Sequence, residues 1–78
     1  MKVFGYSKEK SGSLLEMAEV SFLADPEQLR QVARLLLKAA DQIEAGGKAF
    51  DHLQLRDEWR GWNANLPDVV VVNSNVYG

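Results

Sequence analysis

The stretch DPEQLRQVARLLLKAADQIEAGG, residues 25–47, decides the fold because it predicts one long helix with both ends marked. At its start, Asp25 can accept a hydrogen bond from the free amides of the first turn, Pro26 suits the first helical position, and Gln28 stands where a capping box needs it. At its end, a pair of glycines can adopt the left-handed conformation that closes a helix without steric penalty. The other segments must therefore pack around this helix.

The apolar residues of the helix predict which of its faces packs against the rest of the protein. At about 100° per residue, most of them fall on one stripe, with Leu37 and Ala39 at its edges and Leu35 turned toward the polar side. The residues of the stripe are Leu29, Val32, Ala33, Leu36, Ala40 and Ile43. A single stripe of this width needs one partner surface, and a sheet is the natural one.

Four short segments outside the helix have the composition of strands, with many β-branched and aromatic residues. They span residues 3–6, 14–23, 50–55 and 69–72. The polar residues 7–13 connect the first two segments. In the second segment the apolar residues change parity near Met17 or Ala18, which favours a bulge there. The last segment is a run of four valines, apolar on both faces, which is typical of an interior strand.

The element order β-β-α-β-β predicts an α+β fold, with one four-stranded, mainly antiparallel sheet and the single long helix packed on one face. Because side chains alternate along a strand, we place Leu53 and Leu55 against the helix. The same alternation leaves His52 and Gln54 on the open face of the sheet.

Length and composition limit the class of protein. A chain of 78 residues makes one domain, which we assign to residues 1–73, followed by a polar C-terminal tail at residues 74–78 that need not be ordered. The lack of cysteine and of a signal-peptide pattern favours a cytoplasmic location. No apolar run approaches the ~20 residues that span a membrane. The net charge of -2 gives no overall drive toward nucleic acid.

His52 is the only histidine, and therefore the only side chain that ordinarily titrates near neutral pH. Catalysis would need an acid or nucleophile at a suitable spacing, and a metal site would need further ligands, for which Asp51 and Gln54 are the nearest candidates. Alternation places Asp51 on the opposite face of the strand, and an amide is a poor ligand for transition metals. We therefore expect no catalytic, cofactor or metal site, and a hydrogen-bonding His52 on the open face.

Arg30, Arg34 and Lys38 line one edge of the helix at four-residue spacing. Such a strip could bind phosphates or an acidic partner. Glu27 and Asp41 interrupt it, however, and no nucleic-acid-reading motif accompanies it. We interpret the strip as a solvated face of the helix and expect no nucleic-acid partner.

The irregular segment between the third and fourth strands carries two tryptophans three residues apart. They either cap one end of the core or anchor a partner, since tryptophan is enriched at the energetic centres of interfaces. Aspartate and glutamate nearby, including Asp68, would give such a surface an acidic rim. The candidate partner-binding residues are Trp59, Trp62, Arg56, Asp57, Glu58 and Arg60.

Several short motifs together resemble one known family. They are Val3-Phe4-Gly5-Tyr6-Ser7, Glu19-Val20, Asp25-Pro26-Glu27-Gln28-Leu29, Asp51-His52-Leu53-Gln54-Leu55 and Pro67-Asp68-Val69-Val70-Val71. With them the chain, to about Asn73, resembles a family of small immunity proteins of bacterial polymorphic toxin systems. In that family a second histidine often follows two positions after the first, where this chain has Gln54.

The resemblance implies a non-enzymatic protein that neutralises a cognate toxin by direct binding. The alternative is a small homodimeric structural or adaptor domain with no toxin partner, and an enzyme or a nucleic-acid binder comes third. We expect a homodimer because one helix covers only one face of the sheet, and the valine run then leaves apolar side chains exposed on the other. We expect no membrane partner.

Overall fold

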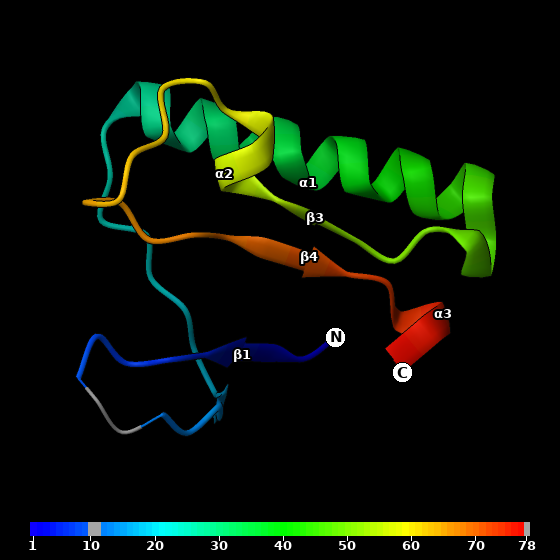
Figure 1. The fold of residues 1–78 in the computed structure, drawn as a ribbon, viewed down its shortest axis with the longest axis horizontal. Helices are drawn as coiled ribbons and strands as arrows, with labels where there is room; N and C mark the ends of the chain where they lie inside the picture. Colours follow the sequence, from blue (N-terminus) through cyan, green and yellow to red (C-terminus); the bar gives the residue numbers. More distant parts are fainter. Residues whose placement is uncertain (10–11, 78) are drawn as a thin grey trace.

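The computed structural model of the protein describes residues 1–9 and 12–77 (Figure 1). These described residues form one long helix, two short antiparallel sheets and three short helical turns. The element order is β1 (Val3–Gly5), β2 (Leu15–Met17), α1 (Pro26–Gly46), the 3-10 helix η1 (Gly47–Ala49), β3 (His52–Gln54), α2 (Leu55–Glu58), β4 (Val70–Val72) and α3 (Ser74–Tyr77).

Helix α1 begins and ends where its sequence predicts. The Asp25 carboxylate accepts a hydrogen bond from the Gln28 N–H at 2.8 Å, and the Gln28 side-chain oxygen accepts one from the Asp25 N–H at 3.0 Å. This reciprocal pair satisfies two of the free amides of the first turn. At the other end, Gly47 has a φ of 52° and donates its N–H to the carbonyl of Ile43. The predicted helix and both of its caps are confirmed.

The buried face of α1 is not the one that the apolar stripe predicts. Leu35 is 2 % exposed and Ala39 is 0 % exposed, whereas Leu36, in the middle of the predicted stripe, is 48 % exposed. The predicted register is therefore wrong, by about 100° around the helix axis. The reason is that apolar side chains cover more than half of the circumference of α1, so periodicity alone does not select the face that the sheet covers.

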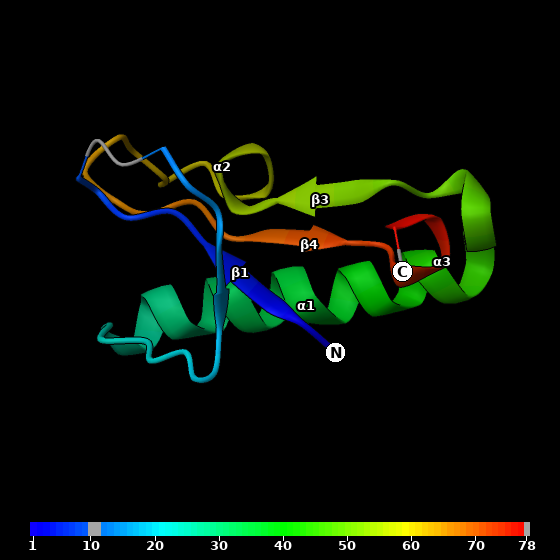
Figure 2. The same ribbon diagram turned by 90° about the horizontal axis from the view of Figure 1, so that it is seen from below.

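The strands form two separate two-stranded sheets, so the predicted four-stranded sheet is not confirmed. In the first, Val3 pairs with Met17 and Gly5 with Leu15; β3 and β4 form the second, in which Leu53 pairs with Val71. Figure 1 shows β1 beyond β4, on the side away from β3, and Figure 2 shows β1 crossing β4 at an angle instead of running alongside it. Sequence composition identifies these strands but does not say which of them pair.

The β3–β4 sheet lies against α1 through one face only. Leu55 is buried and Leu53 and Val71 are half-buried, which confirms the predicted placement of the two leucines toward the helix. Val70 and Val72, with the opposite parity, are exposed. The prediction that the valine run is an interior strand is therefore wrong: β4 is paired on one edge, and one of its faces meets solvent.

The second strand is shorter than the sequence predicts. Strand β2 ends at Met17, and residues 18–25, all of which the structure describes, form neither helix nor strand. The change of parity therefore marks the end of the strand, not a bulge. The predicted polar connection at residues 7–13 includes residues 10 and 11, which lie outside the described residues.

The end of the chain folds back on the core through Asn73. Its side-chain amide is fully buried and donates hydrogen bonds of 2.7 Å to the carbonyls of Gly47 and Phe50. Its side-chain oxygen accepts from the Asn75 N–H at 2.9 Å. Residues 74–77, which the sequence suggests as a polar tail, form α3. Asn73 thus joins the end of β4 to the loop that follows α1.

Candidate partner-binding surface

Helix α2 sets the position of Trp59. The helix begins at the buried Leu55, whose N–H donates to the carbonyl of Val69 at 2.9 Å and ties α2 to the strand segment opposite. The Trp59 N–H donates to the Leu55 carbonyl at 2.9 Å, and the Trp62 N–H donates to the Trp59 carbonyl at 3.1 Å. Backbone hydrogen bonds therefore hold both tryptophans in place, although neither lies in a long element.

Each tryptophan side chain is half-buried and has its own local support. The Trp62 indole N–H donates to the carbonyl of Pro67 at 3.0 Å. The Trp59 indole lies over Gly61, where a Cβ atom would come within 2.7 Å of its ring nitrogen. Gly61 therefore gives this indole the room it needs. The two rings are neither fully core nor fully free.

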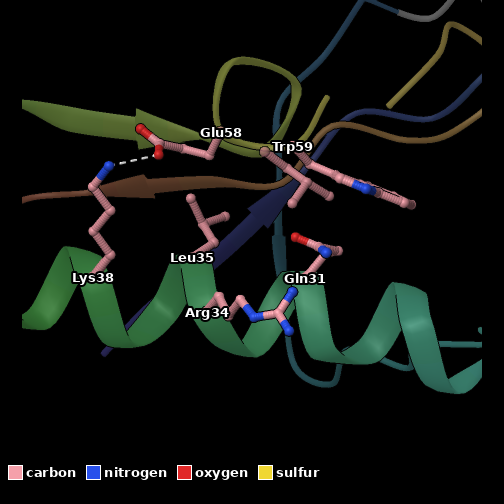
Figure 3. A pocket seen from close by; sticks show the side chains of 7 residues that line it. Gln31, Arg34, Leu35, Lys38, Glu58 and Trp59 are labelled. Carbon is pink, nitrogen blue, oxygen red and sulfur yellow. Dashed lines mark hydrogen bonds and ion pairs between the residues drawn. The ribbon is translucent and has the colours of Figure 1, made fainter. Parts of the chain in front are cut away.

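A groove of about 200 Å³ runs between α1 and α2 (Figure 3). Leu35 and Leu55 contribute its apolar lining. Its polar side is an ion pair in which the Lys38 ammonium lies 2.7 Å from a Glu58 carboxylate oxygen. Figure 3 shows this pair at one end of the groove, with Trp59 across from α1. We call the set formed by Gln31, Arg34, Lys38, Glu58 and Trp59 the Trp59 surface.

A second, more apolar hollow of about 370 Å³ also includes Trp59 in its lining. Phe22 and Leu23 contribute to it from the segment before α1, and Leu66 and Val69 from the segment before β4. Trp59 therefore lies between a hollow with charged walls and one with apolar walls.

The structure divides the six predicted partner-binding residues. Glu58 and Trp59 line the groove, whereas Asp57 and Arg60 are exposed beside it. Trp62 does not line the groove; it is half-buried, and its indole N–H donates to the Pro67 carbonyl. Arg56 is engaged within the chain: its N–H donates to the Asp68 carboxylate at 3.1 Å, and its Nε lies 3.6 Å from the same carboxylate. Asp68 thus anchors the start of α2 and is only partly available to form an acidic rim.

Sequence reasoning missed the contribution of α1 to this surface. Arg34 and Lys38 were assigned to a solvated strip, and the structure brings both to the groove, together with Gln31. Arg30 of the same strip does not line it. The four-residue spacing showed that these side chains share an edge of α1, but no signal in the sequence tells that α2 lies opposite this edge.

A second polar cluster lies at the other end of β3. The Asp51 carboxylate is 2.6 Å from His52 Nδ1 and accepts a 2.7 Å hydrogen bond from the Tyr77 hydroxyl. The Gln54 side-chain oxygen is 3.2 Å from His52 Nε2. The prediction that Asp51 points away from His52 is therefore wrong. Asp51 precedes β3, so its side chain is not bound by the alternation of the strand.

This cluster shifts the acidity of its members. The hydrogen bond to Asp51, followed by the one to Gln54, raises the pKa of His52 above its ordinary value of 6.5. Hydrogen bonds from Tyr77 and His52 lower the pKa of Asp51 below 3.8. Asp51 in turn raises the pKa of Tyr77 above 10.0. An oxygen acceptor beside each ring nitrogen favours the cationic form of His52, in which both nitrogens donate.

The same shifts fix how the cluster contributes to stability as pH changes. The contribution of His52 is fully present below pH 6.5 and is lost as pH rises through its raised pKa. The contribution of Asp51 is present above pH 3.8 and is lost as pH falls through its lowered pKa. Both contributions to stability are present in mildly acidic solution, between pH 3.8 and pH 6.5.

The two clusters differ in the chemistry that their side chains offer. In its cationic form His52 has no free lone pair, so it could accept a proton or bind a metal ion only above its raised pKa. Among residues 1–9 and 12–77, no group of three histidine, aspartate or glutamate side chains is arranged to hold a metal. Within the same residues no helix is both long enough and apolar enough to cross a membrane. The Trp59 surface, by contrast, combines an aromatic ring, apolar walls and charged side chains.

Comparison with known families places most of the chain in a single match. The family model described as Immunity protein 32 matches residues 19–75. The matched region contains α1, β3, α2 and β4, and therefore the whole Trp59 surface, whereas β1 and β2 lie outside it. No curated protein and no solved structure gives a significant match.

Proposed function

Because the chain belongs to the Immunity protein 32 family, we propose that it neutralises a cognate bacterial toxin by binding it directly, in the cytoplasm and without enzymatic chemistry. The family match is the observation that carries this proposal. The geometry supports the Trp59 surface as the site of the contact, since this surface lies inside the matched residues and is open to solvent.

We propose that Trp59 is the central anchor of the toxin contact. Binding energy at interfaces concentrates in a few residues, and tryptophan beside a hollow, surrounded by polar side chains, is a frequent arrangement. The backbone hydrogen bond from Trp59 to Leu55 and the close approach to Gly61 already restrict the ring. A restrained anchor loses less conformational entropy on binding than a mobile one.

Charge at the groove suggests the character of the partner surface. Lys38 is paired with Glu58, but among the described residues no ion pair is found for Arg34. A toxin surface with a carboxylate facing Arg34 and an apolar side chain facing Trp59 would match the groove in both charge and shape. Exposed Asp57 and Arg60 would belong to the rim of the contact, where charges affect association rate more than affinity.

The proposal predicts a toxin gene immediately upstream of this chain's gene, and it is tested with the toxin domain which that gene encodes. The chain and that domain are expressed together, growth is scored, and the affinity of the purified pair is measured by titration calorimetry. We expect growth to be rescued by the chain and Arg34→Glu to weaken binding by about tenfold or more, since reversing a charge at an interface costs over 1.4 kcal/mol. No rescue and no binding would refute the proposed function.

Arg30→Glu is the matched control for Arg34→Glu. Both changes reverse the same charge on the same helix, one turn apart, but Arg30 does not line the groove. Equal weakening by the two variants would show that the contact depends on overall charge and that the Trp59 surface is not the site. If the toxin binds and neither variant changes the affinity, the contact lies on another surface, and the proposed neutralising role still holds.

We also propose that the protein is a homodimer. Val70 and Val72 leave apolar side chains exposed on the open face of the β3–β4 sheet, and surface of this kind commonly marks a contact. The competing function, a homodimeric adaptor with no toxin partner, shares this property. Only the toxin experiment separates the two, because the adaptor would dimerise and yet give no growth rescue.

A further inference from the structure

The protein exposes far more surface than a folded chain of its mass ordinarily does. Its accessible surface is 6466 Å², whereas the mass of 8.7 kDa corresponds to about 4,700 Å² for a compact monomer. Its radius of gyration is 13.2 Å, against about 11.5 Å for 78 residues. Roughly 1,700 Å² per chain is therefore available for burial against something else.

Part of this excess lies along one side of α1. We define the outer α1 face as the exposed apolar residues Leu29, Ala33, Leu36 and Ala40. These residues follow one another at three- and four-residue spacing, so they form a continuous stripe beside the buried face that carries Leu35. The apolar stripe that sequence analysis assigns to the core is thus largely uncovered in the single chain.

The free edge of β4 also lacks a partner. The Leu55 N–H donates to the Val69 carbonyl, and the Asn73 N–H donates to the Asp51 carbonyl. In this segment the backbone N–H and C=O groups of the odd-numbered residues therefore point toward β3. The N–H and C=O groups of Val70 and Val72 therefore point away from β3, and the described residues supply no further strand on that edge. An open edge of this kind is a template for another strand.

The β1–β2 hairpin has the properties of the missing strand pair. In its register Val3 lies opposite Met17, and Gly5 opposite Leu15, so these residues share one face. Leu15 is 50 % exposed and Met17 is 42 % exposed, and the opposite face carries Phe4 and Glu16. The hairpin thus presents an apolar face that its own chain leaves uncovered, and an isolated two-stranded hairpin is only marginally stable in water.

We propose that two copies of the chain exchange their hairpins: β1 of each copy adds to the free edge of β4 in the other, and the apolar hairpin face covers the outer α1 face. The inference rests on the homodimer proposed above, but it assigns the contact to the β4 edge and the outer α1 face instead of the open face that carries Val70 and Val72. Each copy then has a four-stranded sheet under one helix, and the two contacts are equivalent by two-fold symmetry. Val3, Leu15 and Met17 of one copy pack near Leu29 and Leu36 of the other.

The available area fits a second copy. Two chains that each lose about 1,700 Å² bury about 3,400 Å² in total, within the range of obligate homodimers. The segment that joins the hairpin to α1 also favours exchange. Its residues 21–24 line the hollow beside Trp59, at the start of α1, and the hairpin that continues from it does not pair with β4 of its own chain. Residues 18–25 reach up to about 27 Å when extended, enough to cross to a neighbour.

The test uses cross-linking, because the chain contains no cysteine and single introduced thiols react cleanly. Full-length chains carrying Leu15→Cys are mixed with full-length chains carrying Leu36→Cys, and a short bismaleimide is added. We expect a product of about twice the chain mass of 8.7 kDa that contains one chain of each kind. Asp41→Cys in place of Leu36→Cys is the control, since this position lies on the polar side of α1, and it should give little product.

A second measurement does not depend on cross-linking geometry. Leu36→Lys should reduce the mass in light scattering from two chains to one at a concentration where the parent is dimeric. Leu37→Lys makes the same change one position along, about 100° around the helix and outside the outer α1 face, and should leave the dimer intact. Circular dichroism of each variant checks that α1 is retained.

The remaining outcomes each overturn the exchange. A monomeric parent removes both the exchange and the homodimer. A dimer that yields no cross-link between hairpin and α1, or that tolerates Leu36→Lys, removes the exchange and leaves a homodimer built through another face. In a double variant with Leu15→Cys and Leu36→Cys, a cross-link that forms only within one chain, and so leaves the mass of a single chain, shows that the hairpin docks on its own chain. None of these results bears on toxin neutralisation, which the growth assay decides separately.

Discussion

Replacing Leu35 with alanine tests the packing of α1 at the position where structure and sequence pattern disagree most. The Leu35 side chain is 2 % exposed and lines the groove between α1 and α2. A buried Leu→Ala change loses transfer free energy and leaves a cavity, which together cost about 2–5 kcal/mol. A domain of 78 residues has roughly 4–12 kcal/mol of total stability. The change should therefore remove a large part of it.

Leu36→Ala is the matched comparison, because it deletes the same atoms from the adjacent residue of the same helix. Leu36 is 48 % exposed in the single chain, so its loss there should cost about 1 kcal/mol or less. If the hairpins exchange, Leu36 becomes buried in the dimer, and its cost should grow with protein concentration. The cost of Leu35→Ala should be the same at every concentration.

The assay is thermal unfolding of parent and both variants, followed by circular dichroism over a range of protein concentrations. One kcal/mol corresponds to about 4–8 °C in a domain of this size, so Leu35→Ala should lower the midpoint by at least about 8 °C. In dilute solution Leu36→Ala should stay within a few degrees of the parent. A larger loss for Leu36→Ala than for Leu35→Ala in dilute solution would refute the burial described for α1 and restore the stripe predicted from the sequence.

Three further predictions concern single positions. Asn73→Ala removes the hydrogen bonds from a buried amide to the Gly47 and Phe50 carbonyls and should cost about 2–4 kcal/mol in chemical denaturation. A stability equal to that of the parent would contradict the role of Asn73 in holding the chain end. In an NMR titration His52 should show a midpoint above 6.5 that falls in Asp51→Asn, and an unchanged midpoint in that variant would show that the carboxylate does not stabilise the cation. His52→Gln should leave toxin binding unchanged, and it should leave stability unchanged at a pH above the midpoint measured for His52. Stoichiometric zinc in the parent that this variant loses would overturn that view. Trp59→Ala should weaken toxin binding by ~2 kcal/mol or more with α1 intact, whereas lower stability with unchanged affinity of the folded fraction would make it a core residue only. Trp62→Phe keeps an aromatic ring but loses the indole hydrogen bond to the Pro67 carbonyl, so it serves as the control for a purely structural effect.

Several features of the candidate site could be predicted from the sequence. The two tryptophans and their charged neighbours stood out by composition, and Glu58 and Trp59 do lie in the groove. The open-face position of His52 also followed from alternation along β3 and is confirmed. The role of Arg56 could not be foreseen, because its partner Asp68 lies twelve residues further on and meets it only once β3 and β4 have paired.

The contribution of α1 to the site needed the tertiary structure. Arg34 and Lys38 share an edge of the helix by spacing alone, but the sequence offers no reason to prefer them over Arg30. The preference arises because α2 lies against one part of this edge and brings Glu58 within 2.7 Å of Lys38. The position of α2 depends on the strand pairing that precedes it, a contact between distant segments.

The sequence by itself determined the features that depend on interactions between residues close together in the chain. The limits of α1 follow from Asp25, Gln28 and Gly47, each of which bonds to a residue three or four positions away. Interactions of this range act whatever the remaining chain does. The short strands followed from composition for a similar reason, although their lengths were predicted too long.

What only the tertiary structure decided is which surfaces meet. Leu35 and Leu36 are equally apolar neighbours, and the sheet covers one and leaves the other half exposed. Asn73 is as polar as the residues that follow it, yet it is buried because two carbonyls of a distant loop need its donors. Burial is a property of a pair of surfaces, and a local pattern describes only one member of the pair.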